Sequence, residues 1–600
     1  MQATGSAVTR STTIADLVSR SAERFGDLTA IRRKVDGAWE DLTFSDVDAV
    51  AGEIALGLLE LGVEPGDRVC LLATTRAEWS FCHFAIAGVG AVAVPIYPTN
   101  SPEECAWVAG DSGAVAVVCE DAAQLAKVRA VRDGLADLRT IVVMEPSAGA
   151  GDAVTLDEVR ARGRVRARAE LDARRSAVVP EDTFTIIYTS GTTGPPKGCV
   201  LSHGNYRQVL DMCEAIRGIT TDDEIYLFLP LAHSFGLLMQ LLAFDLGATL
   251  DYFGGDTNQI VAELQELRPT YLPSVPRLFE KVYGLTLGSQ PPEAQERMRA
   301  AARLGLKVRR MQAAGEEVPE ALMRPFEQAE EQLFSKVRAV FGGRLRQAVS
   351  GAAPIAPEIL EFFYGCGVPV LEGYGLTETA TVSASSTLEH HRLGSVGRLL
   401  PGVEGRIGED GELLLRGPNV FQGYWSHAAG DADFGAVIDG WLYTGDLATI
   451  DEDGYVFITG RKKDIIITAG GKNVAPANLE NDMKRSRWIS QAVMHGDRRP
   501  YPVMLITLDE EQVVPWAREQ GISDTSVAAL AGDPSVRALV QAELDLVNER
   551  YARPEQVKRF FILEHDLAQA TGELTPTLKV KRDVVAQKYA DRLAALYGDE

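Results

Sequence analysis

The sequence predicts an α/β protein with parallel sheets, followed by a β-rich segment and a smaller mixed segment at the C-terminal end. Apolar strands alternate with helical patterns from about residue 42, which is typical of parallel sheets covered by helices. From Gly411 the chain changes to short strands separated by Gly and Asp turns, as in DGWLYTGD and DEDGYVFITG. Because 600 residues exceed the size of one compact core, we expect several domains.

The alternation can be followed element by element in the first part of the chain. Residues 45–61 have a helical pattern, and the apolar strand RVCLLA follows at 68–73. After a further helix comes the strand AVAVPIY at 91–97. The Ser-Pro pair at 101–102 suits an N-cap and a first helical turn, and the strand AVAVVC follows at 114–119. This order of elements indicates repeated βα units.

Two basic segments stand out from the alternation. Arginines crowd residues 160–175 without interleaved aromatics, which favours a solvated face over a nucleic-acid patch. Between 282 and 342 the pattern is helical throughout, and we expect its apolar stripe to pack in the core. That stripe consists of Phe326, Ala329, Leu333, Val337 and Val340. A basic cluster at 297–310 leaves two interpretations open, a solvated helical arm and a peripheral membrane contact.

Composition excludes several classes of protein. The net charge is −24 at pH 7, a sign opposite to that of a general nucleic-acid binder. The seven cysteines are scattered without a CxxC pair, so neither a disulfide framework nor a zinc site is indicated. No apolar run approaches the length of a membrane span or a signal peptide, so we expect a cytoplasmic protein.

The most informative segment is TFTIIYTSGTTGPPKG at 183–198, where an apolar strand runs into a loop of hydroxyls, glycines and one lysine. Glycines let backbone amides approach an anion, hydroxyls donate hydrogen bonds, and Lys197 supplies a positive charge. Such a loop suits a polyphosphate. It is not a Walker A loop, because prolines precede Lys197 and Gly198 follows it. A P-loop ATPase is therefore disfavoured.

In this loop the chain resembles the adenylate-forming superfamily of acyl-CoA synthetases, luciferases and peptide-synthetase adenylation domains. The other signatures of that superfamily follow in order as LPLAHSFG, GYGLTET, GWLYTGD, GRKKD, AGGKNVAP and LTPTLKVKR. The segment LPSVPRLFEKVY and the helical insertion after it resemble the long-chain fatty acyl-CoA synthetases. The resemblance extends from about residue 12 to residue 590.

The resemblance implies a fold and a division into domains. It implies a large N-terminal domain of stacked α/β sheets with a small β-barrel-like subdomain, and a small mobile α+β C-terminal domain. We place the N-terminal, AMP-binding domain at 1–460, with a helical insertion at about 284–342, and the C-terminal domain at 461–600.

The resemblance also implies the residues that bind ATP. A carboxylate must approach the α-phosphate of ATP, and at about 4 Å each unit-charge repulsion is of order 4 kcal/mol at an effective dielectric of 20. Mg²⁺ would bridge phosphate oxygens, with Thr189 and Glu378 as its ligands. Tyr374 would stack on adenine, and Asp446 would accept both ribose hydroxyls near Arg461. The other residues expected at ATP are Ser190, Gly191, Thr192, Thr193, Gly194, Lys197, Gly351, Glu372, Gly373 and Thr377.

The adenylation lysine needs separate assignment, because Thr577-Leu578-Lys579 replaces the SGK that is usual in the superfamily. Register favours Lys579, and Lys581 remains the alternative. Its flexible stem would bring a positive charge to the substrate carboxylate and to the bridging oxygen of ATP.

The second half-reaction needs the thiol of coenzyme A at the same site. The resemblance implies that the C-terminal domain rotates about a hinge at Lys463 and exchanges Lys579 for the AGGKN loop. In that loop Gly470 and Gly471 would let the pantetheine arm pass, and Lys472 would contact the nucleotide end. His233 in LPLAHSFG would line the acyl or adenylate site, and the apolar run 237–244 would form part of the acyl channel, although a structural histidine and a core helix are equal alternatives.

The sequence thus predicts an AMP-forming ligase that joins a medium- to long-chain fatty acid to coenzyme A through an acyl-AMP intermediate. Its co-substrates would be ATP and coenzyme A, with Mg²⁺ as cofactor. A fatty acyl-AMP ligase and a CoA ligase for a bulkier acid remain alternatives within enzymes. A non-catalytic acyl-binding regulatory protein is the alternative from another class.

Overall fold

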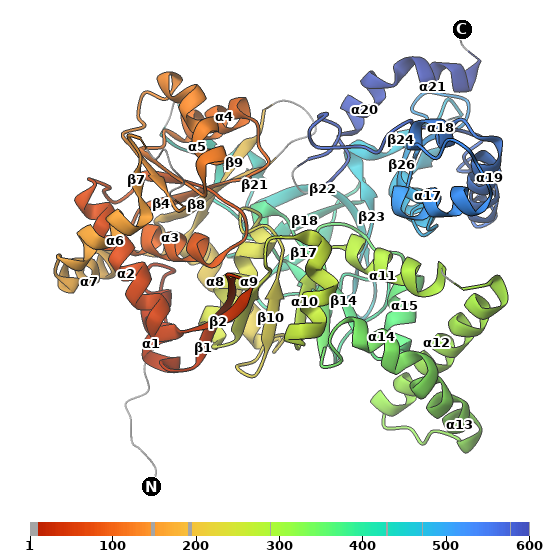
Figure 1. Ribbon diagram of the computed structural model, residues 1–600, viewed down its shortest axis with the longest axis horizontal. Helices are drawn as coiled ribbons and strands as arrows, with labels where there is room; N and C mark the ends of the chain where they lie inside the picture. Colours follow the sequence, from red (N-terminus) through yellow and green to blue (C-terminus); the bar gives the residue numbers. More distant parts are fainter. Residues whose placement is uncertain are drawn as a thin grey trace.

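The computed structural model describes residues 10–145, 151–189, 195–288, 290–427, 430–470, 472–575 and 578–598. Before residue 462 these residues form two nine-stranded sheets and one five-stranded sheet, and the residues after them form a smaller unit with its own sheets (Figure 1). The predicted α/β architecture, with a large N-terminal part and a smaller C-terminal part, is confirmed.

The first large sheet contains the βα units expected near the N-terminus. Its central strands β4, β3, β5 and β6 are parallel, because helices return the chain to the same edge between them. Ser101 caps α4 (Pro102–Ser112) as its sequence predicts. The strand order is β20 (Asp431–Asp433), β19 (Gly423–Ser426), β9 (Lys197–Ser202), β8 (Thr183–Thr189), β4 (Val92–Ile96), β3 (Arg68–Leu72), β5 (Ala116–Cys119), β6 (Thr140–Val143) and β7 (Val154–Thr155).

The second large sheet is parallel over most of its width and carries antiparallel strands at both edges. Its strand order is β16 (Arg398–Leu399), β15 (Ala384–Ser385), β14 (Val370–Tyr374), β13 (Gln347–Ser350), β12 (Tyr271–Ser274), β10 (Glu224–Leu227), β11 (Thr249–Tyr252), β1 (Thr29–Val35) and β2 (Ala38–Thr43).

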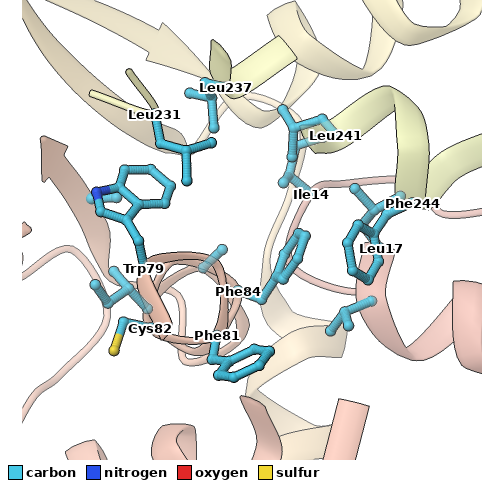
Figure 2. Packing of buried hydrophobic residues seen from close by; sticks show 14 of the residues in the cluster. Ile14, Leu17, Trp79, Phe81, Cys82, Phe84, Leu231, Leu237, Leu241 and Phe244 are labelled. Atoms are coloured by element: carbon cyan, nitrogen blue, oxygen red, sulfur yellow. The ribbon is translucent and has the colours of Figure 1, made fainter. Parts of the chain in front are cut away.

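One hydrophobic core joins the two large sheets. Helices α3 (Ala77–Gly88) and α9 (Ser234–Leu246) meet there, and Figure 2 shows Phe84 of α3 near Phe244 of α9. All but one of the residues of α9 are buried, which explains why its sequence is apolar on every side. Other helices of this part are α1 (Leu17–Phe25), α2 (Phe44–Glu60), α5 (Ala122–Val131), α8 (His203–Ala215), α10 (Ile260–Leu267) and α15 (Pro357–Gly365).

The arginine-rich segment 160–175 is largely exposed, as a solvated face would be, but several of its arginines also pair with acidic residues of other helices. It forms α6 (Leu156–Arg164) and α7 (Arg168–Ala177), which pack on α2. Arg160 and Arg164 bind Glu53, and the nearly buried Arg175 binds Asp48. The arginines therefore attach these helices to acidic residues of the same chain, a pairing that local sequence does not reveal.

The expected helical segment projects from the second sheet at the lower right of Figure 1. Its apolar stripe packs in a core cluster as predicted, with Phe326, Leu333 and Val337 buried. The helices are α11 (Pro276–Gly288), α12 (Pro292–Ala313), α13 (Glu320–Ala329) and α14 (Ser335–Val340).

The five-stranded sheet is antiparallel and leads into the C-terminal unit, which has separate core clusters. It consists of β17 (Glu404–Ile407), β18 (Glu412–Arg416), β22 (Trp441–Ile450), β21 (Val437–Ile438) and β23 (Val456–Arg461). The C-terminal strands are β24 (Ile466–Ile467), β25 (Asn473–Val474), β26 (Ile489–His495), β27 (Val503–Leu508) and β28 (Arg559–Ile562). Its helices are α16 (Pro476–Met483), α17 (Glu510–Glu519), α18 (Val527–Ala531), α19 (Pro534–Asn548), α20 (Arg582–Lys588) and α21 (Ala590–Tyr597).

Candidate active site

A cavity of about 1200 Å³ lies where the two large sheets, the five-stranded sheet and the C-terminal unit meet. Its wall contains residues from segments that are far apart in the sequence. Most of the predicted site residues in the described ranges line it, namely Thr189, Lys197, His233, Gly351, Gly373, Tyr374, Thr377, Glu378, Arg461, Lys463 and Lys579. The sequence signatures thus converge on one space.

The phosphate-loop segment contributes the ends of two antiparallel strands. Thr189 ends β8 and Lys197 begins β9, and the two residues are paired across the ladder. The Thr189 hydroxyl donates to the Lys197 carbonyl oxygen at 3.4 Å. The residues of the loop itself, Ser190, Gly191, Thr192, Thr193 and Gly194, lie outside the described residues.

Tyr424 links Lys197 to Glu378. The Lys197 ammonium lies 5.1 Å from the centre of the Tyr424 ring, which is cation–π range. The Tyr424 hydroxyl donates to Glu378 Oε1 at 2.8 Å. Glu378 lies in a short 3₁₀ turn, Thr377–Thr379, shortly after β14. Sequence analysis missed Tyr424, because its role depends on the pairing of β19 with β9.

Tyr374, Asp446 and Arg461 form a hydrogen-bonded group at the end of β14. The Tyr374 hydroxyl donates to Asp446 Oδ2 at 2.8 Å, and Arg461 Nε lies 3.1 Å from Asp446 Oδ1. Asp446 and Arg461 are register partners on β22 and β23. Burial raises the pKa of Asp446, although Arg461 opposes that shift. Asp446 itself is buried and is not among the residues that line the cavity, whereas Tyr374 and Arg461 are.

Glu372 is placed differently from its neighbours in the motif. It is not among the residues that line the cavity. Burial raises the pKa of its carboxyl to about 8, and backbone amides of Gly394 and Ile355 partly offset this shift. Gly375, which sequence analysis did not single out, lies beside the cavity where a Cβ would come 2.0 Å from the Thr381 carbonyl oxygen.

Lys579 and Lys581 both reach the cavity from a tight turn of the C-terminal unit. The turn is closed by the Thr575 amide, which donates to the Lys579 carbonyl oxygen at 2.8 Å. The Lys579 side chain is exposed within the cavity, where protein surrounds it. The surrounding protein partly desolvates the ammonium, which lowers its pKa. Arg461 lowers this pKa further, and Asp446 opposes the shift. Lys579 is therefore within electrostatic range of the Tyr374–Asp446–Arg461 group.

His233 is both the cap of α9 and part of the cavity wall. Its Nδ1 accepts a hydrogen bond from the Phe235 amide at 3.2 Å. Burial, aided by the charge of Lys579, lowers the pKa of the imidazole to about 3. The ring is thus neutral, and its proton lies on Nε2. His233 thus has a structural role at the start of α9, and its predicted role at the acyl or adenylate site stays a prediction.

The residues on either side of Lys463 bind opposite parts of the molecule. Lys462 Nζ lies 3.0 Å from Glu412 Oε2 of the five-stranded sheet. Asp464 Oδ2 lies 3.7 Å from Arg582 Nε of the C-terminal unit. Lys463 lies between these two attachments, in the short 3₁₀ helix Lys462–Asp464, and its exposed side chain lines the cavity.

The AGGKN segment does not line the cavity. Lys472 Nζ instead pairs with Glu555 Oε1 at 3.2 Å, within the C-terminal unit. Gly470 is exposed, and Gly471 lies outside the described residues. In the described conformation the C-terminal unit therefore presents Lys579, not Lys472, to the cavity.

The cavity continues into an apolar arm along α9. Leu238, Met239, Leu242 and Leu246 line it, so the expected apolar run contributes one helical face to the wall. The opposite wall was not predicted. It comes from the end of α8 and from the second sheet, and consists of Cys213, Ile216, Ile219, Tyr271, Gln347 and Val349. Only the tertiary fold brings these residues to α9.

Comparison with known proteins finds similarity in both the N-terminal and the C-terminal part of the chain. The family model "AMP-binding enzyme" matches residues 18–425, and the model "AMP-binding enzyme C-terminal domain" matches residues 463–600. A long-chain-fatty-acid–CoA ligase, FadD15 of Mycobacterium bovis, is 40% identical over 578 residues, which cover 96% of this chain and 95% of that protein. The long-chain-fatty-acid–CoA ligase ACSBG2 of Xenopus laevis is 32% identical, with 98% of this chain and 84% of that protein covered.

Solved structures show the same fold at lower identity. The anthranilate CoA ligase AuaEII in complex with anthranoyl-AMP has a TM-score of 0.72 and 22% identity, with 99% of this chain and 100% of that chain covered. A fatty acyl CoA synthetase of Mycobacterium tuberculosis has a TM-score of 0.61 and 21% identity, covering 97% and 99%. From its two matched domain models and its full-length relatives, the chain belongs to the AMP-binding enzyme family.

Proposed function

We propose that this chain is an ATP-dependent, AMP-forming ligase that joins a long-chain fatty acid to coenzyme A. The observation that carries the proposal is one continuous cavity with a polar end at Lys197, Glu378 and Lys579 and an apolar arm along α9. A polyphosphate and an acyl chain could occupy these two ends together. The full-length similarity to long-chain-fatty-acid–CoA ligases supports the same activity.

The polar end suits attack of a carboxylate on the α-phosphate. Both reactants are anions, so the site must supply positive charge, and Lys197, Arg461 and Lys579 all line the cavity. The carboxylate oxygen would bond to the α-phosphorus as the bond to pyrophosphate breaks. We assign Lys579 to this step in preference to Lys581, because its register in the LTPTLKVKR motif favours it and its side chain lines the cavity near Arg461 and Asp446.

The Tyr374–Asp446–Arg461 group suits the nucleoside. Its hydrogen bonds hold the Tyr374 ring in one orientation at the cavity wall, where an adenine could stack on it. Asp446 can accept ribose hydroxyls on its remaining lone pairs. Gly351, Gly373 and Thr377 line the cavity and would lie beside the nucleotide. Glu372 does not line it, so its predicted contact with the nucleotide is not part of this proposal.

Mg²⁺ fits the pair of oxygen ligands at Thr189 and Glu378. Both side chains belong to the cavity wall, and one carboxylate with substrate phosphates is the ligand set that Mg²⁺ commonly takes. The hydrogen bond from Tyr424 to Oε1 leaves Oε2 of Glu378 to bind the ion. When bound, the ion would neutralise charge on the phosphates.

The apolar arm suits a long acyl chain. Helix α9 extends about 18 Å from Ser234 to Leu246. The residues that line the arm, Leu238 to Leu246, span about 12 Å of this helix. An extended chain of single bonds advances about 1.2 Å per bond, so this stretch corresponds to roughly 10 carbon–carbon bonds. Each methylene buried there contributes about 0.8 kcal/mol of binding free energy.

The thioester step requires a second arrangement of the C-terminal unit. The coenzyme A thiol would attack the acyl-AMP carbonyl and release AMP. Lys472 is directed away from the cavity in the described conformation, and the attachments of Lys462 and Asp464 favour rotation at Lys463. Gly470, Gly471 and Lys472 would then contact coenzyme A.

A peripheral contact with the inner face of the cytoplasmic membrane is part of the proposal for α12. Among the described helices none is both long and apolar enough to span a bilayer. Helix α12 belongs to the projecting arm (Figure 1). Arg297, Arg303 and Lys307 are exposed on it, whereas Val308 belongs to a core cluster and Leu304 packs against it. The contact would therefore be electrostatic. Salt-sensitive binding to anionic vesicles, lost on changing these three basic residues to glutamine, would support it, and equal binding to neutral vesicles would refute it.

The activity is tested with fatty acids of increasing chain length, ATP and Mg²⁺, with and without coenzyme A. We expect AMP and acyl-CoA in equal amounts when coenzyme A is present. Pyrophosphate exchange without thioester formation would identify an acyl-AMP ligase, and preference for a bulkier acid would identify a different CoA ligase. Fatty-acid binding without release of pyrophosphate would indicate a regulatory protein.

A further inference from the structure

The apolar arm ends at a partition that has a second cavity on its other side. Ile219 and Leu246 line the arm, and the same two residues line a separate cavity of about 570 Å³. Their exposed fractions are only 7% and 8%, so each side chain fills the space between the cavities. The side chains of these two residues therefore separate the two cavities.

The two residues come from different elements that meet at the end of the arm. Leu246 is the last residue of α9, and its carbonyl oxygen accepts a hydrogen bond from the Thr221 hydroxyl at 3.0 Å. Ile219 precedes Thr221 in the segment between α8 and β10. This contact fixes the segment against the end of the helix, and thereby fixes the position of the partition.

The second cavity opens to solvent. Asp211, Glu214, Ala215 and Arg217 line it and are exposed. The apolar residues that line it are Ala215, Ile219 and Leu246. An acyl chain that passed the partition could place its methyl end against the two buried members, Ile219 and Leu246.

We propose that Ile219 and Leu246 set the upper limit of acyl chain length by closing the arm before the second cavity. The inference rests on the proposed function, because it assigns the terminal methyl group to the partition end of the arm. Chains that fit the arm gain binding free energy with each methylene, and a longer chain meets the partition. Truncating either side chain should join the two cavities and admit longer chains.

The test measures kcat/KM for saturated fatty acids of increasing length in the wild-type protein, Leu246→Ala and Ile219→Ala. We expect the longest accepted chain to increase in both variants. For lengths beyond the wild-type limit, kcat/KM should rise about fourfold for each methylene newly buried. The second variant keeps the proposal falsifiable if Leu246→Ala fails to fold.

Two further variants distinguish the opening of the partition from a general loosening of the packing around α9. Leu241→Ala makes the same truncation on α9, but Leu241 lies in the core and lines neither cavity, so the length limit should stay unchanged. Ala215→Trp combined with Leu246→Ala should fill the second cavity and restore the wild-type limit. Ala215 is exposed, so the added ring has room.

The outcomes also separate this inference from the proposed function. If the wild-type protein forms no acyl-AMP with any chain length, the proposed function fails. If it does form acyl-AMP and both truncations lower activity equally at all lengths, the partition does not limit chain length. If the Leu246→Ala variant still accepts longer chains after Ala215→Trp is added, the second cavity does not receive the end of the acyl chain, and the inference is wrong.

Discussion

Lys579 is the residue to which we assign the charge stabilisation in the proposed adenylation step. It enters the cavity from a turn of the C-terminal unit, beside groups of both signs at Arg461 and Asp446. Its ammonium can reach the substrate carboxylate only while that unit keeps the described position. Because Lys579 would act in only one conformation, its removal should slow one half-reaction and spare the other.

We therefore expect Lys579→Ala to abolish most adenylation and to spare thioester formation from supplied acyl-AMP. The loss reflects missing stabilisation of charge in the transition state, where one such group is worth about 3–4 kcal/mol. Single-turnover assays of each half-reaction measure this difference, with Lys581→Ala as the matched control. An equal loss in both steps, or a larger loss in the control, would contradict the assignment.

The pH dependence of adenylation should reflect the lowered pKa of Lys579. A lowered pKa means that the ammonium loses its proton at a lower pH than an ordinary lysine does. The kcat/KM for ATP should therefore decrease as the pH rises, and the apparent pKa of this decrease should lie below the usual lysine value of 10.5.

Arg461→Leu provides the check on that limb. Arg461 lowers the pKa of Lys579, so its removal should move the limb to higher pH even though activity falls. A limb that stays in place would show that the titrating group is not Lys579.

At the level of elements, close contact between helices holds the periphery of the first sheet. A Cβ on Gly163 of α6 would lie 1.8 Å from the Glu53 carbonyl oxygen of α2. Only glycine permits this approach, which also lets Arg160 and Arg164 reach Glu53.

We expect Gly163→Ala to lower the free energy of unfolding by about 1–3 kcal/mol, because the helices must separate. The matched control is Gly284→Ala in α11, where no atom lies within 4 Å of the added Cβ. That variant should be neutral or up to about 1 kcal/mol more stable, since alanine suits a helix better. Denaturant unfolding measures both, and equal effects would contradict the packing argument.

Local patterns predicted elements well and contacts between distant elements poorly. The cap at Ser101 and the strand at Arg68–Leu72 depend on neighbouring residues, and the sequence contains that information. The docking of Arg175 on Asp48 and the role of Tyr424 depend on elements that only the fold brings together. The signature motifs therefore predicted residues at the polar end of the cavity. They did not predict Ile219 and Tyr271, which line the apolar arm only because the fold brings them to α9.

At the level of the whole molecule, the described conformation presents the adenylation lysine to the cavity. Ion pairs between the two parts accompany this arrangement. Glu358 of α15 accepts hydrogen bonds from Arg485 and Arg550 of the C-terminal unit, both at 3.0 Å. Lys281 also pairs with Glu511 at 2.8 Å.

Loss of Glu358 should shift the population away from the adenylation conformation. Glu358 makes two partly exposed pairs, each worth up to about 1 kcal/mol, so we expect Glu358→Ala to slow adenylation by up to about thirtyfold and to leave thioester formation unchanged or faster. Glu361→Ala on the same helix is the control. Equal slowing of both half-reactions would show that the contact does not bias the conformations.

The most direct test of the account follows an oxygen atom. A fatty acid labelled with heavy oxygen in its carboxyl group is incubated with the protein, ATP, Mg²⁺ and coenzyme A, and the AMP is analysed by mass spectrometry. If the carboxylate attacks the α-phosphorus, one labelled oxygen appears in each AMP formed. Unlabelled AMP, or ADP in its place, would contradict the account.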